Sequence, residues 1–399
     1  MDIRLGQAKI DLEERKVSRD PATPLPLPDT VALVLQGGGA LGSYQAGVYE
    51  ALLKQDIRLD WVAGISIGAI NAALIAGNRR SEALDKMRQF WDLVTSGTLN
   101  MVLADTHAWL EANHMLGAMT AATLGAPGFF RPHLIPPWFA WPKSDNAISL
   151  YDTTPLADTL DKLIDWDRLN DGPVRLSVGA VDIETGNFQY FDTRDAENPT
   201  RIDARHIMAS GALPPGFPPI EIDGRHYWDG GLLSNTPLSH VVDHQSEDML
   251  VFQVDLFPAR GELPEKFADV LSREKDIRYS SRTRAVTDQV LRLRKEHEAI
   301  RNVLAMLPEE ARDNPDVERV RALLNDNAIN IVHLIYKAQK WESGARDFEF
   351  SRTTMMHHWS QGRKAVDSVV AKGGLLARNI LDGKTAAFDL GGEGRHIRD

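Results

Sequence analysis

Two stretches of the chain decide its fold: VALVLQGGGALG at residues 31–42 and WVAGISIG at residues 61–68. Each begins as an unbroken apolar run and reaches glycine, which is typical of a strand buried on both faces of a parallel sheet. Each is followed by a segment with apolar residues available for helix packing, at 43–55 and 69–76. This order of strand, turn and helix, occurring twice, predicts an α/β fold with a central parallel sheet.

Ser66 stands at the centre of the second stretch, in Gly64-Ile65-Ser66-Ile67-Gly68. A GxSxG sequence between a buried strand and a helix predicts a serine on a sharp turn, with its hydroxyl presented to substrate. The alternative is a glycine-lined strand end whose serine only caps the helix.

The first stretch contains the glycine-rich run GGGALG at residues 37–42. It satisfies the GxGxxG pattern of dinucleotide-binding folds, but such a site also needs an acidic residue at the end of the second strand. Here Asp60 comes before that strand, so the nucleotide interpretation is disfavoured. The N–H groups of Gly38 and Gly39, at a helix N-terminus, are instead suited to stabilising an oxyanion.

A serine nucleophile needs a base. An α/β-hydrolase would supply Asp or Glu and then His after the serine. Three downstream histidines have no recognisable context: His226, His240 and His244. Asp229 has one, since Gly230 and Gly231 let backbone or substrate approach closely, although an isolated Asp-Gly-Gly is also an ordinary turn.

These motifs, in this order, resemble the patatin-like phospholipase family over about residues 31–240. The matching and flanking stretches are Gln36 to Gly42, Gly64 to Gly68, Pro214 to Pro219, Asp229-Gly230-Gly231 and Asn235-Thr236-Pro237. The resemblance implies a patatin-like three-layer α/β/α fold with a central, mostly parallel sheet. One position departs from many members, which carry Arg or Lys where this chain has Leu41.

The resemblance also implies a Ser-Asp dyad, with Ser66 as nucleophile and Asp229 as base. The glycine-rich loop, Gly37, Gly38 and Gly39, would form the oxyanion hole. Five further glycines would support the motifs: Gly42, Gly64, Gly68, Gly230 and Gly231. The implied reaction is hydrolysis of fatty-acyl esters of lipids through an acyl-enzyme, of the phospholipase A or lysophospholipase type. It requires no cofactor and no metal.

Two other classes of function stay open. The same acyl-enzyme chemistry serves esterases, thioesterases and acyltransferases that act on acyl substrates other than phospholipids. The chain could also be a non-catalytic regulatory protein that binds a partner through its C-terminal part.

The chain divides into four predicted parts. Residues 1–30 form a flexible N-terminal tail that ends in a proline-rich stretch, 31–255 the patatin-like catalytic domain, 256–375 a mainly helical C-terminal extension, and 376–399 a tail. The extension resembles a region of unknown function in some bacterial patatin-like proteins. From Val286 onward its apolar residues recur at helical spacing: Val290, Leu293, Ile300, Leu304 and Leu307. This face is expected to pack on the catalytic domain or on a second subunit.

Residues 98–150 interrupt the catalytic domain with an insertion rich in proline and aromatic residues. The aromatic residues are Trp109, Phe129, Phe130, Trp138, Phe139 and Trp141. Aromatic side chains favour the boundary between apolar and aqueous phases, which suggests a lid or lipid-facing flap. The alternative is a long insertion packed against the body of the protein.

Composition limits the partners and the compartment. The net charge of −11 argues against a general nucleic-acid binder. The absence of cysteine excludes disulfides, thiolate metal sites and a cysteine nucleophile. Residues 1–16 lack the apolar core of a signal peptide, and the uncharged run 62–77 is too short to span a bilayer. We therefore expect a cytoplasmic protein that contacts membranes at most peripherally.

Overall fold

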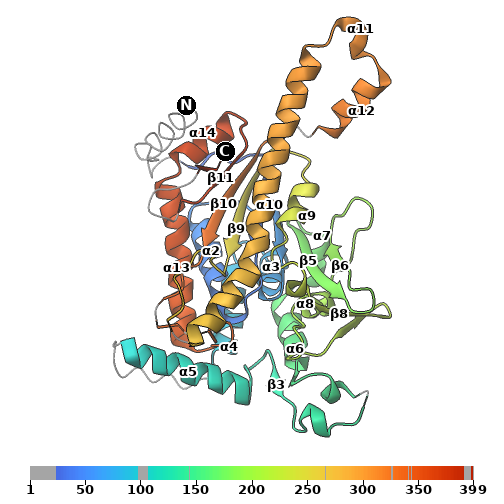
Figure 1. Ribbon diagram of the computed structural model, residues 1–399. Helices are drawn as coiled ribbons and strands as arrows, with labels where there is room; N and C mark the ends of the chain where they lie inside the picture. Colours follow the sequence, from blue (N-terminus) through green and yellow to red (C-terminus); the bar gives the residue numbers. More distant parts are fainter. Residues whose placement is uncertain are drawn as a thin grey trace.

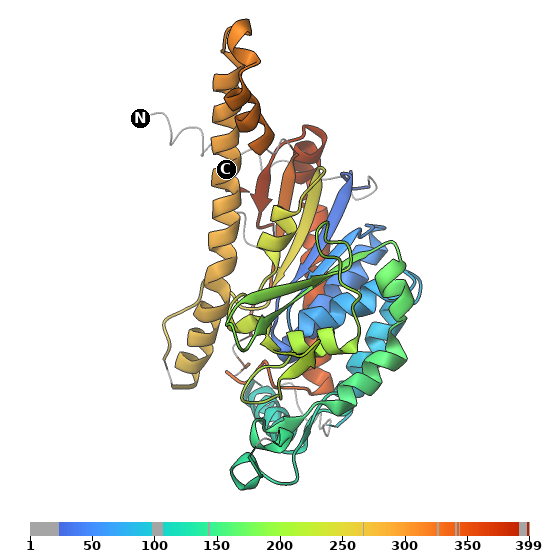
Figure 2. The ribbon, with the colours of Figure 1, turned by 90° about the vertical axis from the view of Figure 1, so that its right-hand side faces the viewer.

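The computed structural model contains a central β-sheet covered by helices on both faces (Figures 1 and 2). It describes residues 24–97, 107–142, 144–265, 267–324, 327–339, 341–342, 344–390 and 397–398.

The central sheet has the strand order β12-β11-β10-β9-β1-β2-β5-β8-β7, with β6 paired to β5 off this path. The strands are β1 (Thr30–Leu35), β2 (Trp61–Gly64), β5 (Arg175–Asp182), β6 (Phe188–Asp192), β7 (Ile220–Ile222), β8 (Arg225–Asp229), β9 (Met249–Asp255), β10 (Ile329–Ile335), β11 (Ala386–Phe388) and β12 (Ile397–Arg398). From β11 to β5 every neighbouring pair is parallel, whereas β12, β6, β8 and β7 run antiparallel to their neighbours. The prediction of a mostly parallel sheet is confirmed.

Side chains of each central strand point alternately to two hydrophobic cores. In β1, Leu33 and Leu35 enter the larger core, whereas Ala32 and Val34 enter the smaller one. Helices that contribute to the larger core are α2 (Gly42–Lys54), α3 (Ile67–Ala76), α4 (Ala83–Val94), α6 (Thr154–Leu163), α7 (Trp166–Asp171), α8 (Ala204–Ser210), α13 (Arg352–Ala371) and α14 (Gly374–Leu381). The smaller core is covered by α9 (Leu238–Asp243) and α10 (Phe267–Ala305). The fold is therefore the predicted three-layer arrangement.

The predicted strand–turn–helix units correspond closely to β1 and α2, and to β2 and α3. The other elements are one longer helix, α5 (His107–Leu124), and several short ones: η1 (Gly39–Leu41), β3 (Arg131–Pro132), η2 (Pro137–Phe139), η3 (Asp145–Ala147), β4 (Tyr151–Asp152), η4 (Gly230–Leu232), α11 (Glu309–Arg312) and α12 (Pro315–Leu323). In the part of the chain that the structure describes, no helix is both long enough and apolar enough to cross a membrane.

The C-terminal part of the chain differs from the prediction in two ways. The predicted helical extension contains a strand, β10, which pairs with β9 and so continues the central sheet. The tail predicted at 376–399 contains most of α14 and all of β11, whose Phe388 is fully buried. These residues are ordered because β11 finds a parallel partner in β10, a contact that local composition does not reveal.

The long helix α10 begins at Phe267, earlier than the apolar periodicity indicates. Val290 packs against the sheet, whereas Leu293 and Ile300 are 47% and 38% exposed, so from Leu293 onward the predicted face does not pack on the catalytic domain. The reason is visible in Figure 1: α10 runs past the end of the sheet and carries α11 and α12 at its far end. Whether a second subunit covers this part stays a prediction, which sedimentation analysis would test.

The aromatic insertion divides into a buried and an exposed part. Phe129 and Phe130 are 7% and 6% exposed and belong to the larger core. Trp138, Phe139 and Trp141 are 74%, 77% and 86% exposed. Part of the insertion is therefore packed against the body of the protein, and part is exposed as a lipid-facing flap would be. Residues 98–106 and 143 of the insertion lie outside the described residues.

Candidate active site

Ser66 lies on a sharp turn between β2 and α3. Its φ of 56° and ψ of −125° are strained for a residue with a side chain. The turn is possible because two glycines flank it. A Cβ on Gly64 would lie 2.2 Å from the carbonyl oxygen of Gly68, and a Cβ on Gly68 would lie 2.4 Å from that of Leu35. This is the geometry expected for a GxSxG turn, and it directs the serine side chain away from the sheet.

Ser210, at the end of α8, connects the turn to the neighbouring strand β5 through two hydrogen bonds. The Ser66 N–H donates to Ser210 Oγ at 3.0 Å, and Ser210 Oγ donates to the carbonyl oxygen of Gly179 in β5 at 2.7 Å. Ser210 is fully buried. Sequence reasoning missed it, because a lone serine at a helix end carries no motif.

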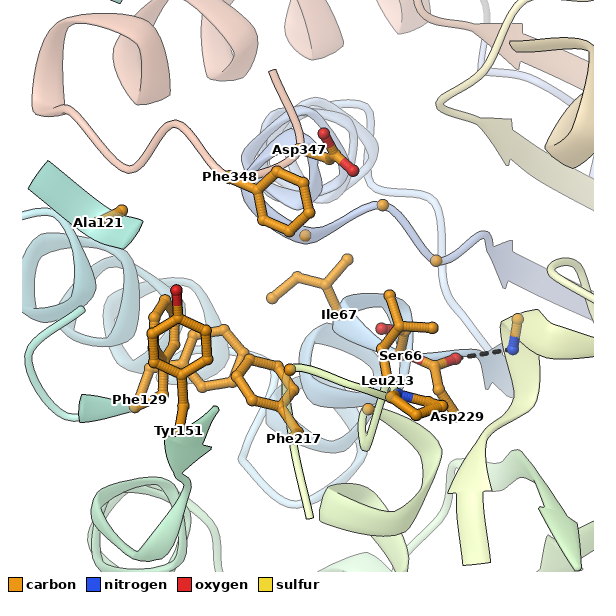
Figure 3. A pocket seen from close by; sticks show the side chains of 18 of the residues that line it. Ser66, Ile67, Ala121, Phe129, Tyr151, Leu213, Phe217, Asp229, Asp347 and Phe348 are labelled. Atoms are coloured by element: carbon orange, nitrogen blue, oxygen red, sulfur yellow. Dashed lines mark hydrogen bonds between the residues drawn. The ribbon is translucent and has the colours of Figure 1, made fainter. Parts of the chain in front are cut away.

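Asp229 ends β8 and lies against Ser66 (Figure 3). Its carboxylate accepts a hydrogen bond of 2.7 Å from the Gly231 N–H and lies beside the Ser66 side chain. The side chain is almost completely buried, at 2% residue exposure. Burial raises the pKa of the Asp229 carboxyl to about 7, although the Gly231 N–H and the neighbouring Ser66 hydroxyl oppose the rise. The structure thus brings together the two residues predicted to form the dyad, 163 positions apart in the sequence (229 − 66).

The glycine-rich loop passes beside the serine. A Cβ on Gly37 would lie 3.0 Å from Ser66 Cβ and 2.4 Å from Asn235 Oδ1. The Gly37 N–H donates to the Asn235 carbonyl oxygen at 3.1 Å, and Asn235 Nδ2 donates to the Gly37 carbonyl oxygen at 3.0 Å. The Gly37 N–H, predicted as one of the oxyanion donors, is therefore engaged with Asn235, and its part in an oxyanion hole stays a prediction. The N–H groups of Gly38 and Gly39 have no hydrogen-bond partner among the described residues.

The supporting glycines predicted from the motifs lie around the same point. Gly42 begins α2, directly after the loop, and Gly230 and Gly231 form η4 directly after Asp229. Leu41, where many family members have a cation, is fully buried in the larger core and offers no charge to the site.

An apolar cavity of about 380 Å³ opens beside Ser66 and Asp229. Aromatic rings form much of the lining: Phe129, Phe130, Tyr151, Phe217 and Phe350. In Figure 3, Phe129 and Tyr151 lie at the end away from Ser66. The rings are in contact, with centroids 4.9 Å apart for Phe130 and Tyr151 and 5.2 Å for Phe130 and Phe217. Such a cavity suits a flexible apolar chain whose polar end lies at the serine.

A family model described as patatin-like phospholipase matches residues 33–242, more than half of the chain. The chain belongs to the patatin-like phospholipase family. A second model, described as patatin phospholipase, matches residues 277–379, most of the predicted extension and the first residues of the predicted tail. The resemblance inferred from the three motifs is confirmed.

Several relatives share part of this patatin-like chain. An uncharacterized NTE family protein of Mycobacterium tuberculosis is 24% identical over 61% of this chain and 55% of its own length. Human patatin-like phospholipase domain-containing protein 6 is 37% identical, over 20% of this chain. The chain matches only 6% to 7% of the length of the animal relatives. Among solved structures, human GIVD cytosolic phospholipase A2 aligns with 94% of this chain and 63% of its own, at 10% identity and a TM-score of 0.41.

The three histidines considered as bases lie elsewhere in the patatin-like fold and do not line the cavity. His240, for example, contacts Asp192 at 2.8 Å in a buried network that includes Arg175. Within the described residues, no group of His, Asp and Glu is arranged to hold a metal ion.

The extension contributes to the site, which sequence reasoning did not foresee. Tyr279 of α10 and Asp347, Phe348 and Phe350, between β10 and α13, line the cavity. No local motif marks them, because they reach the serine only through the fold.

Proposed function

We propose that this patatin-like protein is a serine acyl hydrolase that cleaves fatty-acyl ester bonds of lipids through Ser66 and Asp229. The observation that supports it most strongly is the Ser66 side chain on a strained turn, beside the buried carboxylate of Asp229 and at one end of an apolar cavity. A nucleophile, its base and a binding site for an apolar chain are therefore adjacent.

In the proposed mechanism, Ser66 Oγ attacks the ester carbonyl carbon while Asp229 accepts the hydroxyl proton. The Gly38 and Gly39 N–H groups donate to the oxyanion that forms. The tetrahedral intermediate collapses, the bond to the alkoxy oxygen breaks, and Asp229 returns the proton to the leaving alcohol. A water molecule then attacks the acyl-enzyme, with Asp229 again as base, and fatty acid leaves.

The pKa of Asp229 suits this role. A base is most effective when its pKa lies near the working pH, because it is then ionised and still a strong proton acceptor. Burial raises the pKa of this carboxyl to about 7, so it can exchange a proton with serine and alcohol near neutrality.

The test is labelling with a fluorophosphonate probe, together with hydrolysis of p-nitrophenyl esters and of a diacyl phospholipid. Ser66→Ala is expected to abolish labelling, and Asp229→Asn to slow it at least about a hundredfold, since loss of a general base costs about 10²–10⁴ in rate. Ser96→Ala is the matched control, because Ser96 lies at the end of α4 and does not line the cavity.

The outcomes separate the alternatives. Phospholipid turnover supports a phospholipase, and turnover of short esters alone supports an esterase. Transfer of the acyl group to an added alcohol or thiol, in place of release to water, supports an acyltransferase. A folded wild-type protein that neither labels nor turns over any ester would contradict the proposal and favour the regulatory interpretation.

We further propose that the protein reaches its lipid through the exposed part of the insertion. We call this part the aromatic tip: Leu134, Ile135, Trp138, Phe139 and Trp141, all at least half exposed. It lies on the β3–β4 connection, at the end of the molecule opposite α11 and α12 (Figure 1). Leu150 and Tyr151, at the end of the same connection, line the cavity. Exposed Trp and Phe side chains favour the membrane interface.

Binding to phosphatidylcholine vesicles tests this contact. The triple variant Trp138→Ala, Phe139→Ala, Trp141→Ala is expected to lose vesicle binding while it hydrolyses a short soluble ester like the wild type. A matched triple variant at the far end, Val303→Ala, Met306→Ala, Leu323→Ala, also removes exposed apolar side chains and should bind normally. Equal binding by both variants would refute the role of the aromatic tip.

A further inference from the structure

A short segment of the C-terminal extension crosses the glycine-rich loop. We call residues 344–350, between β10 and α13, the clasp. Its residues Asp347, Phe348 and Phe350 line the cavity, and Figure 3 shows Asp347 and Phe348 beside the loop, on the side away from Phe217. The clasp therefore closes the cavity at the point where the proposed oxyanion donors lie.

The clasp contacts the loop through its backbone. The Ala40 N–H donates to the Asp347 carbonyl oxygen at 3.0 Å. Gly39 has a φ of +55°, and a Cβ on it would lie 2.2 Å from the same oxygen. The two segments thus approach as closely as glycine permits. Because Ala40 directly follows Gly38 and Gly39, this bond restrains the peptide planes that carry the proposed donors.

Two neighbouring residues of helix α10, Lys275 and Asp276, hold the clasp in place through ion pairs. Lys275 Nζ lies 2.8 and 2.9 Å from the two carboxylate oxygens of Asp347 and donates to the Gly344 carbonyl oxygen at 3.1 Å. The ammonium group also lies 4.7 Å from the ring centroid of Phe348. On the other side, the buried Arg346 pairs with Asp276.

The extension also contacts helix α2, which follows the glycine-rich loop at its C-terminal end. Helix α13 packs on α2, which begins at Gly42 where the loop ends. A Cβ on Gly362 would lie 2.0 Å from the Tyr44 carbonyl oxygen, so the two backbones are in direct contact. Trp359 Nε1 donates to Glu50 at 2.6 Å across the same interface.

We propose that Lys275 is a positioning residue: through Asp347 it holds the glycine-rich loop in the arrangement that directs the Gly38 and Gly39 N–H groups to the oxyanion. The C-terminal extension thereby completes the active site of the catalytic domain. The catalytic half of this inference rests on the proposed function, whereas the structural half, restraint of the loop by the clasp, does not.

The kinetic test uses a short soluble ester, Lys275→Met and Lys275→Arg. Lys275→Met is expected to lower kcat about tenfold or more with KM changed less than twofold, because oxyanion donors act on the transition state and their displacement is costly. Lys275→Arg keeps the ion pair with Asp347 and is expected to restore most of kcat. The control is Lys364→Met, since Lys364 is an exposed lysine of α13.

Hydrogen–deuterium exchange of the peptide that covers residues 36–44 gives a readout independent of activity. Lys275→Met should speed exchange of this peptide, and Lys364→Met should not. If the wild-type protein hydrolyses nothing but exchange still accelerates, the proposed function fails while the clasp stands. If kcat and exchange are both unchanged in Lys275→Met, the inference is wrong. It is also wrong if kcat falls only together with the melting temperature and Lys275→Arg restores neither.

Discussion

Replacement of the buried base should make the protein inactive but more stable at neutral and alkaline pH. Asp229 is 2% exposed, and burial raises the pKa of its carboxyl from an ordinary 3.8 to about 7. A carboxyl whose pKa is higher in the folded state binds a proton there that the unfolded chain has lost. Its contribution to stability is therefore fully present below pH 3.8 and is lost as the pH rises through about 7. Asparagine at this position does not ionise and avoids the loss.

The magnitude follows from the two pKa values. Between them the free energy of unfolding of the wild type falls, relative to Asp229→Asn, by about 1.4 kcal/mol for each pH unit. Over the whole interval between the two pKa values, this relative fall in the free energy of unfolding is about 4 kcal/mol. An experiment between pH 5 and pH 8 covers only the upper part of the interval, which corresponds to about 3 kcal/mol. Because the group is buried, screening by solvent reduces these values little.

The assay is urea denaturation of wild type and Asp229→Asn between pH 5 and pH 8, with the difference in free energy of unfolding plotted against pH. The difference is expected to grow in favour of the variant up to about pH 7 and then to level off. Asp182→Asn is the matched control on the neighbouring strand β5. Hydrogen bonds from the Thr185 and Glu184 N–H groups and from Arg225 lower the pKa of the Asp182 carboxyl below its ordinary 3.8, so Asp182 is ionised in both the folded and the unfolded state above pH 5, and the difference for Asp182→Asn should not change between pH 5 and pH 8. A flat or falling difference for Asp229→Asn would refute the reasoning.

Four further results are expected. The kcat/KM of the wild type for a soluble ester should rise with pH to a plateau through an apparent pKa near 7, because Asp229 acts when ionised; a profile flat from pH 5 to 8 would contradict this. Gly47→Ala should destabilise the protein by about 1–3 kcal/mol in urea denaturation, since its Cβ would lie 1.9 Å from the Trp359 carbonyl oxygen. Gly186→Ala, at a φ of +68° with no atom near, should cost about 1–2 kcal/mol from backbone strain alone. Phe217→Ala should move the preferred p-nitrophenyl ester toward longer chains, because it opens the aromatic end of the cavity, and an unchanged chain-length profile would exclude Phe217 as a boundary of that cavity.

The sequence predicts the centre of the fold because its signals there are local. The buried strands that lead to Gly37 and Ser66 are unbroken apolar runs, and the turn at Ser66 depends on glycines two residues away on either side. Asp229 is recognisable from Gly230 and Gly231, which follow it directly. The residues that determine the local geometry at these sites lie within a few positions of one another, so a single sequence is enough to identify them.

Contacts between distant segments account for what the sequence does not predict. The sequence does not show that the Gly37 N–H is bonded to Asn235, because that residue lies 198 positions later (235 − 37). Asp347 reaches the loop from the extension, and no motif connects them. The exposed residues of α10 have helical apolar spacing, but periodicity cannot tell how far the sheet beneath the helix extends.

The pairing of β10 with β9 has a consequence for where this chain can be cut. All seven residues of β9 are buried, and they pair with β1 on one side and with β10 on the other. A fragment that ended at Asp255 would carry the complete proposed dyad and glycine-rich loop. It would also leave the hydrogen-bonding groups along one side of a flat, apolar strand without partners, which is a template for aggregation between molecules. The extension thus covers this sheet edge, and we expect the patatin-like core to aggregate without it.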